Sequence, residues 1–402
     1  MTDALRTLNT TEISVPHAVG GERPLLLKRQ MPGLDALRGM AVLAVLLYHG
    51  LYWSLPSARS VILEKFSHLF TFGWLGVNLF FVLSGFLITG ILLDTRGRPH
   101  YAKNFYVRRV LRIVPLYILT LAWFAALNRT TWGYVAVCLL NLANVSRYLP
   151  LSGAGYGVFW SLAVEEQFYL VWPWLVRRLS LRRMVYLCLG ILVACPVLRA
   201  VSEAGLLPLG DSHTMTWLIA DNLAIGGLLA TFLRTRHATL RNVRRLMSGL
   251  LVLGAVLLGI GLRFAHLLHR SSPAGAAFQA EPFILIFSGL VLAALFWGDR
   301  PWILWWTAPL RFLGYISYGL YMLHMLVFQM FDSLPAWLGR TRPQTTMMSM
   351  PEALSRFAIV FSVSVLVCFL SRRYFEDYFL RLKGKLAPNT ASERAKSHEG
   401  HA

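Results

Sequence analysis

The sequence predicts an all-α, polytopic membrane protein with ten transmembrane helices and both termini in the cytoplasm. Three observations predict this fold class. Hydrophobic residues make up 56% of the 402 positions and charged residues only 14%, whereas soluble domains carry roughly a quarter charged residues. Apolar stretches long enough to cross a bilayer recur along the chain. The basic residues also fall unevenly on the segments between those stretches.

A helix that crosses a membrane needs about 20 mostly apolar residues. An eleventh apolar stretch, 131–145, is short and contains Asn141 and Asn144, so we expect a re-entrant or interfacial segment there. The ten predicted spans are 37–55, 70–93, 110–127, 160–176, 184–201, 215–233, 246–264, 282–298, 311–332 and 356–375.

The distribution of Lys and Arg orients these spans. With residues 1–36 in the cytoplasm, 29 of the 39 basic residues fall on inner segments and 10 on outer ones, as the positive-inside rule requires. Making 131–145 a full span would move the four arginines of 177–183 outside. The net charge of +20 is therefore explained by topology, and we expect no nucleic-acid partner.

Ionisable residues inside a membrane span are costly, so each is a candidate functional residue. The first span opens with Asp35 and Arg38, and its apolar run ends at His49. Arg38 and His49 are 11 residues apart, which places them on one helix face about 16 Å apart along the axis. We expect Arg38 at the cytoplasmic mouth and His49 near the middle of the membrane. A packing histidine is the alternative.

Polar groups also enter the next two spans. Asn78 and Ser84 lie in the second span, among glycines that permit close helix approach. Arg109 and Arg112 share one face at the start of the third span. They are either ordinary positive-inside anchors or a clamp for phosphate groups, which guanidinium groups bind through two hydrogen bonds.

Two adjacent carboxylates, Glu165 and Glu166, lie inside the fourth span between Trp160 and Tyr169. Packing does not explain a pair of carboxylates in an apolar helix. They point 100° apart, so they face different neighbours. The sequence gives no basis for choosing between them.

In the ninth span, Ser317, Tyr321 and His324 share a face by their i, i+4 and i+7 spacing. The whole set of polar groups fits two classes of protein. One is an enzyme in which His49 acts as general base on a hydroxyl, and the other is a transporter with a histidine–glutamate proton relay. No Ser-His-Asp motif, P-loop, dinucleotide fingerprint or metal-ligand spacing is present, so we expect no metal. The residues alone leave both classes open.

Five blocks of the sequence resemble the acyltransferase-3 family of membrane acyltransferases. On this resemblance, residues 34–383 form the acyltransferase-3 membrane domain. Residues 1–33 are polar and contain three prolines, so we expect a disordered cytoplasmic segment there, and another at 384–402. The five blocks are LDALRGMAVLAVLLYH (34–49), GVNLFFVLSGFLIT (76–89), RRVLRIVPLY (108–117), WSLAVEEQFYLVWP (160–173) and GYISYGLYMLH (314–324).

The resemblance implies transfer of an acyl group, usually acetyl from acetyl-CoA, to a hydroxyl. Acceptors in the family are mostly cell-surface glycans such as O-antigen, exopolysaccharide or peptidoglycan, and sometimes small molecules such as macrolides. The family pattern of arginine, ten residues and histidine falls on Arg38 and His49, and its acidic block on Glu165 and Glu166. Asn78 stands where many members have Asp.

The resemblance implies a multi-pass protein of the bacterial cytoplasmic (inner) membrane. It also implies a site made of three sets of residues. Its partners are acyl-CoA, a glycan or lipid-linked sugar acceptor, and membrane lipid. We expect a glutamate to orient His49, with direct acyl transfer or a covalent intermediate on His49 or Ser84. The class-level alternatives are acylation of a small molecule and proton-coupled export of a polar metabolite. The expected residues are His49, Glu165 and Glu166 as catalytic groups; Arg38, Arg109 and Arg112 as the acyl-CoA site; and Asp35, Asn78, Ser84, Trp160, Tyr169, Tyr321 and His324 as substrate-binding or supporting groups.

Overall fold

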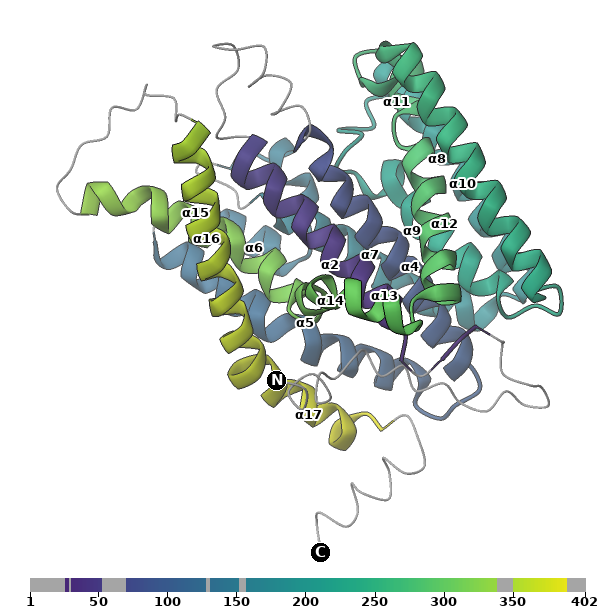
Figure 1. The fold of residues 1–402 in the computed structure, drawn as a ribbon, viewed down its shortest axis with the longest axis horizontal. Helices are drawn as coiled ribbons and strands as arrows, with labels where there is room; N and C mark the ends of the chain where they lie inside the picture. Colours follow the sequence, from purple (N-terminus) through teal and green to yellow (C-terminus); the bar gives the residue numbers. More distant parts are fainter. Residues whose placement is uncertain are drawn as a thin grey trace, which may run out of the picture.

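In the computed structural model the regular structure of the described residues is helical throughout (Figure 1). The structure describes residues 26–28, 30–52, 70–127, 131–151, 157–337 and 350–388. Only helices satisfy all their backbone hydrogen bonds within one segment, which is what an apolar environment requires.

The long helices account for the predicted spans, and short helices connect them. The long ones are α2 (Pro32–Leu47), α4 (Leu75–Thr95), α5 (Tyr101–Ala126), α7 (Phe159–Arg178), α8 (Leu181–Glu203), α9 (Thr216–Phe232), α10 (Leu240–Arg263), α12 (Glu281–Trp297), α15 (Ser317–Trp337) and α16 (Met350–Leu370). The short ones are α6 (Trp132–Leu139), α11 (Pro273–Phe278), α13 (Pro301–Trp306), α14 (Ala308–Tyr315) and α17 (Asp377–Leu386), with π turns η1 (Tyr48–Tyr52) and η5 (Ser371–Glu376) and 3-10 turns η2 (Phe72–Trp74), η3 (Ala143–Tyr148) and η4 (Ala265–Leu268).

Within the described residues each of the ten predicted spans overlaps at least one helix, but only part of the predicted count is confirmed. Seven helical segments of the described chain are long and apolar enough to cross a membrane, so the protein is a multi-pass membrane protein. The other three helices are α7, α9 and α15. Helix α9 has only 17 residues, and α7 carries Glu165 and Glu166 together with two arginines at its end. That these three cross the membrane stays a prediction, as does the cytoplasmic position of the termini.

The stretch 131–145 is broken into two short pieces. Helix α6 has 8 residues and is therefore about 12 Å long, too short for a hydrocarbon core of about 30 Å. Asn141 follows it with a positive φ of 56°, and η3 begins at Ala143. Residues 131–145 therefore do not form a spanning helix.

The predicted disordered ends, 1–33 and 384–402, lie largely outside the described residues. Within the described part, Leu27 is buried and Lys28 forms an ion pair with Asp299. Helix α2 begins at Pro32 and α17 ends at Leu386.

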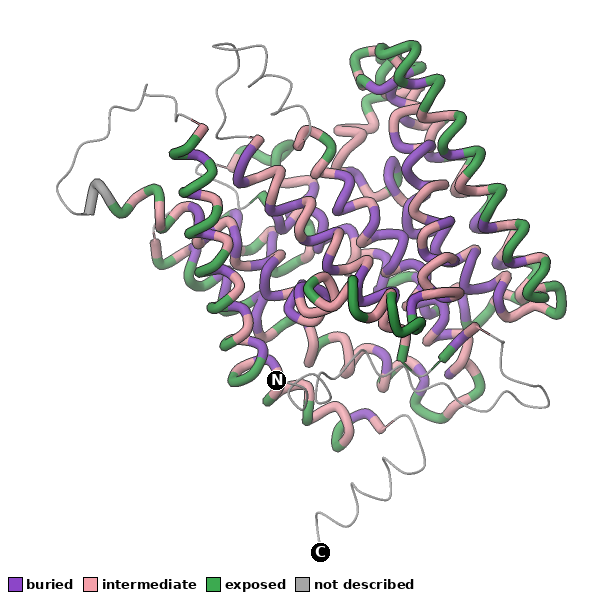
Figure 2. Tube along the Cα trace, viewed as in Figure 1, coloured by how far each residue is buried: buried purple, intermediate pink, exposed green. Residues whose placement is uncertain are grey.

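Glycines set the closest helix contacts. Helix α4 packs against α9, where a Cβ on Gly85 would overlap the carbonyl oxygen of Leu223 and a Cβ on Gly226 that of Val82. Small residues at such crossings let helix backbones touch in lipid. Figure 2 shows the result: buried residues fill the middle of the molecule, while α10 at its edge is exposed along most of its length. The exposed side chains of α10 include Val252, Val256 and Leu262, as expected of a face that contacts lipid.

Contacts among helix ends and connecting segments fall into two groups at opposite ends of the bundle. One group joins the segments that the charge distribution assigns to the inside, and the other joins those assigned to the outside. The first comprises Lys28–Asp299, Arg96 with the Arg177 carbonyl, and Arg234–Asp94. The second comprises Arg147–Asp211, Asn144 with the Thr214 carbonyl, and Arg270 with Ser212. In Figure 1, α17 and α11 mark these two ends.

Replacing Gly85 by Ala should lower the melting temperature of the purified protein in detergent. The added methyl group overlaps the Leu223 carbonyl, and overpacking of this kind costs about 1–3 kcal/mol. Gly190→Ala is the matched control, because a Cβ there meets nothing within 4 Å and Ala favours helix over Gly. Equal melting temperatures for the two variants would contradict the tight α4–α9 contact.

Candidate active site

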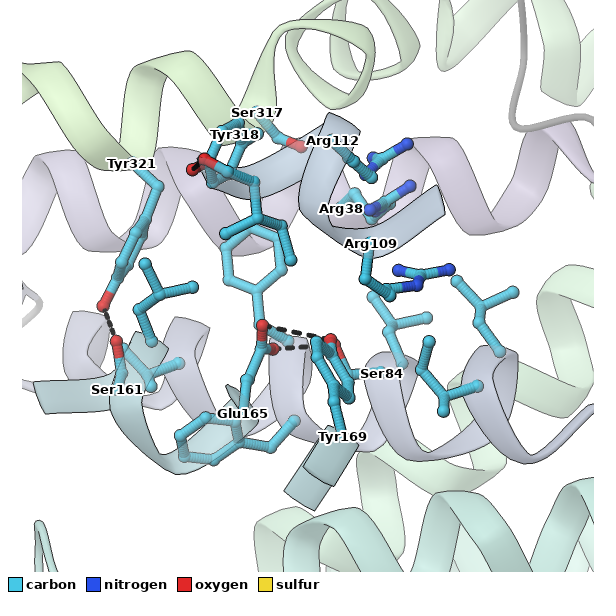
Figure 3. Close-up of a pocket in the computed structure, with 18 of the residues that line it drawn as sticks. Arg38, Ser84, Arg109, Arg112, Ser161, Glu165, Tyr169, Ser317, Tyr318 and Tyr321 are labelled. Atoms are coloured by element: carbon cyan, nitrogen blue, oxygen red, sulfur yellow. Dashed lines mark hydrogen bonds between the residues drawn. The ribbon is translucent and has the colours of Figure 1, made fainter. Parts of the chain in front are cut away.

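Three arginines line one cavity, which we call the arginine cavity. Its volume is about 100 Å³. Arg38 enters it from α2, and Arg109 and Arg112 enter it from α5. Figure 3 shows the three guanidinium groups together on one side of the cavity, with Tyr321 and Ser161 on the other. The sequence prediction that these arginines lie together is consistent with this geometry.

The arginine side is rich in positive charge. Arg109 lies 5.7 Å from the ring centre of Phe105 and 5.6 Å from that of Tyr169, a geometry in which aromatic faces attract the cation. Among the described residues, neither Arg109 nor Arg112 forms an ion pair with a carboxylate. Three guanidinium groups held close together suit a ligand with several negative charges, such as a phosphorylated one.

Glu165 is the carboxylate that lines the arginine cavity. Its Oε1 accepts a hydrogen bond from the Ser84 hydroxyl (2.7 Å) and its Oε2 one from the Tyr169 hydroxyl (3.2 Å). Figure 3 shows this group between the arginines and Tyr321. Glu166 points elsewhere, and its buried Oε1 has no hydrogen-bond partner among the described residues. The geometry therefore separates two residues that the sequence could not distinguish.

His49 lies in a second cavity of about 340 Å³, which we call the histidine cavity. Asn78, Trp160 and Tyr321 also line it. His49 sits in the π turn η1, which extends α2, and π turns are frequent at functional sites. Arg38 and His49 thus face two different cavities.

His49 pairs with His324. Its Nδ1 lies 3.1 Å from His324 Nε2. His324 Nδ1 lies 2.9 Å from the carbonyl oxygens of both Leu320 and Tyr321, so this nitrogen must carry the proton. In a neutral ring Nε2 then accepts, and His49 must donate through Nδ1. This leaves His49 Nε2 with a free lone pair, the form required of a base or a nucleophile.

The expectation that a glutamate orients His49 is replaced by this histidine pair. Neither glutamate contacts His49 in the described structure, because Glu165 bonds to Ser84 and Tyr169 instead. His324, expected only as a supporting residue, takes the orienting position.

The two cavities meet at three side chains. Val77 and Phe81 of α4 and Tyr321 of α15 line both of them. The Tyr321 hydroxyl is hydrogen-bonded to Ser161, and its ring lies edge-on to Phe80. We call Val77, Phe81 and Tyr321 the partition.

The remaining predicted residues divide between the cavities. Asn78 donates to Asn222 Oδ1 (2.9 Å) and lines the histidine cavity, as does Trp160. Tyr169 and Ser84 line the arginine cavity. Asp35 lines neither cavity and is buried where α2 packs on α14.

Sequence reasoning missed the far side of the histidine cavity. Trp74, His213 and Arg270 line it; Trp74 and His213 precede α4 and α9, and Arg270 lies between η4 and α11. The available signal was weak: Trp74 lies near the start of the predicted span 70–93, and His213 and Arg270 lie on predicted outer segments.

The sequence is similar to known acyltransferases. A family model described as an acyltransferase domain matches residues 31–373. A putative peptidoglycan O-acetyltransferase, YrhL of Bacillus subtilis, is 28% identical over 346 residues, covering 74% of this chain and 48% of the relative. The peptidoglycan O-acetyltransferase OatA of Listeria monocytogenes is 26% identical over 327 residues, covering 74% and 49%. The chain therefore spans about half the length of these curated relatives. No solved structure gives a significant match.

Replacing Arg356 by Ala should destabilise the end of α2 that carries His49. Arg356 donates to both carboxylate oxygens of Asp332 (2.7 and 2.6 Å) and to the Gly50 carbonyl (3.3 Å) in η1. Losing these charge-assisted bonds should cost about 1–3 kcal/mol, seen as a lower melting temperature in detergent. Arg373→Ala is the control, because Arg373 is exposed. Equal losses in both variants would show that Arg356 does not hold this turn.

Proposed function

This chain belongs to the acyltransferase-3 family, and on that premise we propose that it is a membrane O-acyltransferase that moves an acyl group from acyl-CoA to a hydroxyl of a cell-surface glycan. Acetyl is the expected acyl group. We place the protein in the bacterial cytoplasmic membrane, with its basic end in the cytoplasm. The acceptor class follows the relatives, two of which are named peptidoglycan O-acetyltransferases.

One observation carries the proposal: a cavity lined by three arginines and a cavity lined by His49 meet at the same three side chains, Val77, Phe81 and Tyr321. A two-substrate transfer needs a donor site and an acceptor site whose reacting groups come together. The partition is such a meeting point, because the arginine cavity lies on one side of it and the histidine cavity on the other.

The arginine cavity suits the phosphate groups of the donor; at about 100 Å³ it is smaller than an ordinary ligand site and would hold only part of acyl-CoA. Coenzyme A carries phosphate groups, and guanidinium groups bind phosphate through paired hydrogen bonds. Arg38, Arg109 and Arg112 would hold those phosphates at the cytoplasmic side. The rest of the cavity leads past Glu165 to Tyr321, which would bring the thioester to the partition.

His49 would act on the acceptor. Its free Nε2 removes the proton of the acceptor hydroxyl, and the hydroxyl oxygen attacks the thioester carbonyl carbon. The carbon–sulfur bond breaks, and the proton taken up by His49 goes to the departing thiolate. His324 positions His49 through their hydrogen bond. The same lone pair would also serve a rival route through an acyl-histidine, and ping-pong kinetics would identify that route.

Replacing His49 by Ala should lower kcat for acyl transfer by about 10²–10⁴-fold, the usual contribution of a general base. The assay follows radiolabelled acetyl groups from acetyl-CoA to glycan, with protein amount and folding matched. His324→Ala should lose less, because the base remains but its alignment is lost. His237→Ala is the control and should keep normal transfer, because His237 is exposed at the other end of the bundle. Normal transfer by His49→Ala would refute the assignment.

Replacing Arg109 by Ala should raise the KM for acyl-CoA more than it lowers kcat, because Arg109 would hold the donor's phosphates and not the reacting carbonyl. Arg178→Ala is the matched control, since Arg178 is exposed at the same end of the bundle and has no place in the cavity. A variant with unchanged KM and reduced kcat would exclude the phosphate clamp.

A further inference from the structure

The far side of the histidine cavity is built from residues that the mechanism above does not use. Trp74 comes from η2, His213 from the segment between α8 and α9, and Arg270 from the segment after η4. These segments belong to the end of the bundle opposite α17 (Figure 1). Side chains from distant parts of the sequence therefore converge on one cavity.

Arg270 is the cation of this region. Its guanidinium lies 5.4 Å from the ring centre of Trp74. Its Nε donates to Gln279 and its Nη1 lies 3.4 Å from the Ser212 hydroxyl. Both partners are neutral, and among the described residues no carboxylate forms an ion pair with Arg270.

The other charged groups around this cavity form ion pairs among themselves, and the Arg199 cluster has one carboxylate in excess. Arg199 pairs with Asp221 (2.5 Å) and Glu281 (2.6 Å), and Asp211 pairs with Arg147. Burial lowers the pKa of His213 to about 3, with Arg270 and Arg147 adding to the shift, so this imidazole is neutral at physiological pH. Burial lowers the pKa of Arg270 to about 9, although the nearby carboxylates of Asp211 and Asp221 raise it, and the group is charged at neutral pH.

Aromatic rings complete the lining. Trp74, Trp160 and Tyr48 face the same cavity, and flat aromatic side chains offer broad apolar surfaces with a polar edge. Such surfaces suit the C–H faces of sugar rings. The volume of about 340 Å³ lies within the range of ordinary ligand sites.

We propose that the histidine cavity is the acceptor site and that Arg270 binds an oxyanion carried by the acceptor, so that the enzyme prefers anionic glycans over neutral ones. This inference rests on the proposed function. Trp74 supports the guanidinium from one side, while the oxyanion pairs with its remaining N–H groups. The oxyanion is either a carboxylate on the sugar or a phosphate that links the sugar to a lipid carrier, because a guanidinium binds both.

The test measures binding and acetyl transfer with three probes. They are a neutral N-acetylglucosamine tetrasaccharide, a hyaluronan tetrasaccharide that carries carboxylates, and N-acetylglucosamine on an isoprenoid diphosphate. The full-length protein should bind at least one anionic probe more tightly than the neutral one, and the preferred probe identifies the source of the oxyanion.

Arg270→Ala should weaken binding of the preferred anionic probe by about tenfold to a hundredfold, the range for a lost charge-assisted bond. The affinity for the neutral probe and the KM for acetyl-CoA should not change. Arg270→Lys should restore part of the preference, and Arg270→Gln, which keeps an amide donor for Gln279, should not. Arg263→Ala is the control, since Arg263 is exposed near the same end of the bundle.

Equal binding of the three probes by the unaltered protein, binding of none, or an unchanged preference in Arg270→Ala would overturn this inference. Acetyl transfer that depends on His49 but ignores acceptor charge would refute it while leaving the proposed function intact. Failure of the protein to bind acetyl-CoA would refute the proposed function itself.

Discussion

The close contact between α4 and α9 is the constraint on which both cavities depend. It exists because Gly85 and Gly226 have no side chains to separate the two backbones. Helix α4 thereby reaches the centre of the bundle, where its Val77 and Phe81 line both cavities and its Ser84 bonds to Glu165. A bulkier residue at the crossing would move all of these groups together.

The charged side chains of the bundle fall into two sets, those that form ion pairs and those that line cavities. Ion pairs such as Arg234–Asp94 and Arg199–Asp221 join helices and neutralise each other. Arg109, Arg112 and Arg270 instead line cavities without a carboxylate in ion-pair contact in the described structure. An unpaired charge away from water is costly, and these cations are the groups to which we assign the anionic ligands in the proposals above.

Much of the candidate site could be predicted because its residue types are rare in apolar helices. Arg38, Glu165 and His49 stand out in spans that are otherwise hydrophobic. Their partners could not be predicted, since spacing within one helix fixes only the direction of each side chain. The expectation that a glutamate orients His49 failed for this reason: His324, 275 positions away, occupies that place.

By itself, the sequence determined that the chain is helical and membrane-embedded, which connecting segments are basic, and which polar residues interrupt the apolar spans. Those properties can be predicted because they depend on composition and on the 3.6-residue repeat, which involve only residues close together in the chain. Only the tertiary structure decided that Glu165 and not Glu166 lines the arginine cavity, that His49 pairs with His324, and that Trp74, His213 and Arg270 meet at one cavity. These outcomes depend on which helices approach most closely, and that is set by contacts between residues far apart in the chain.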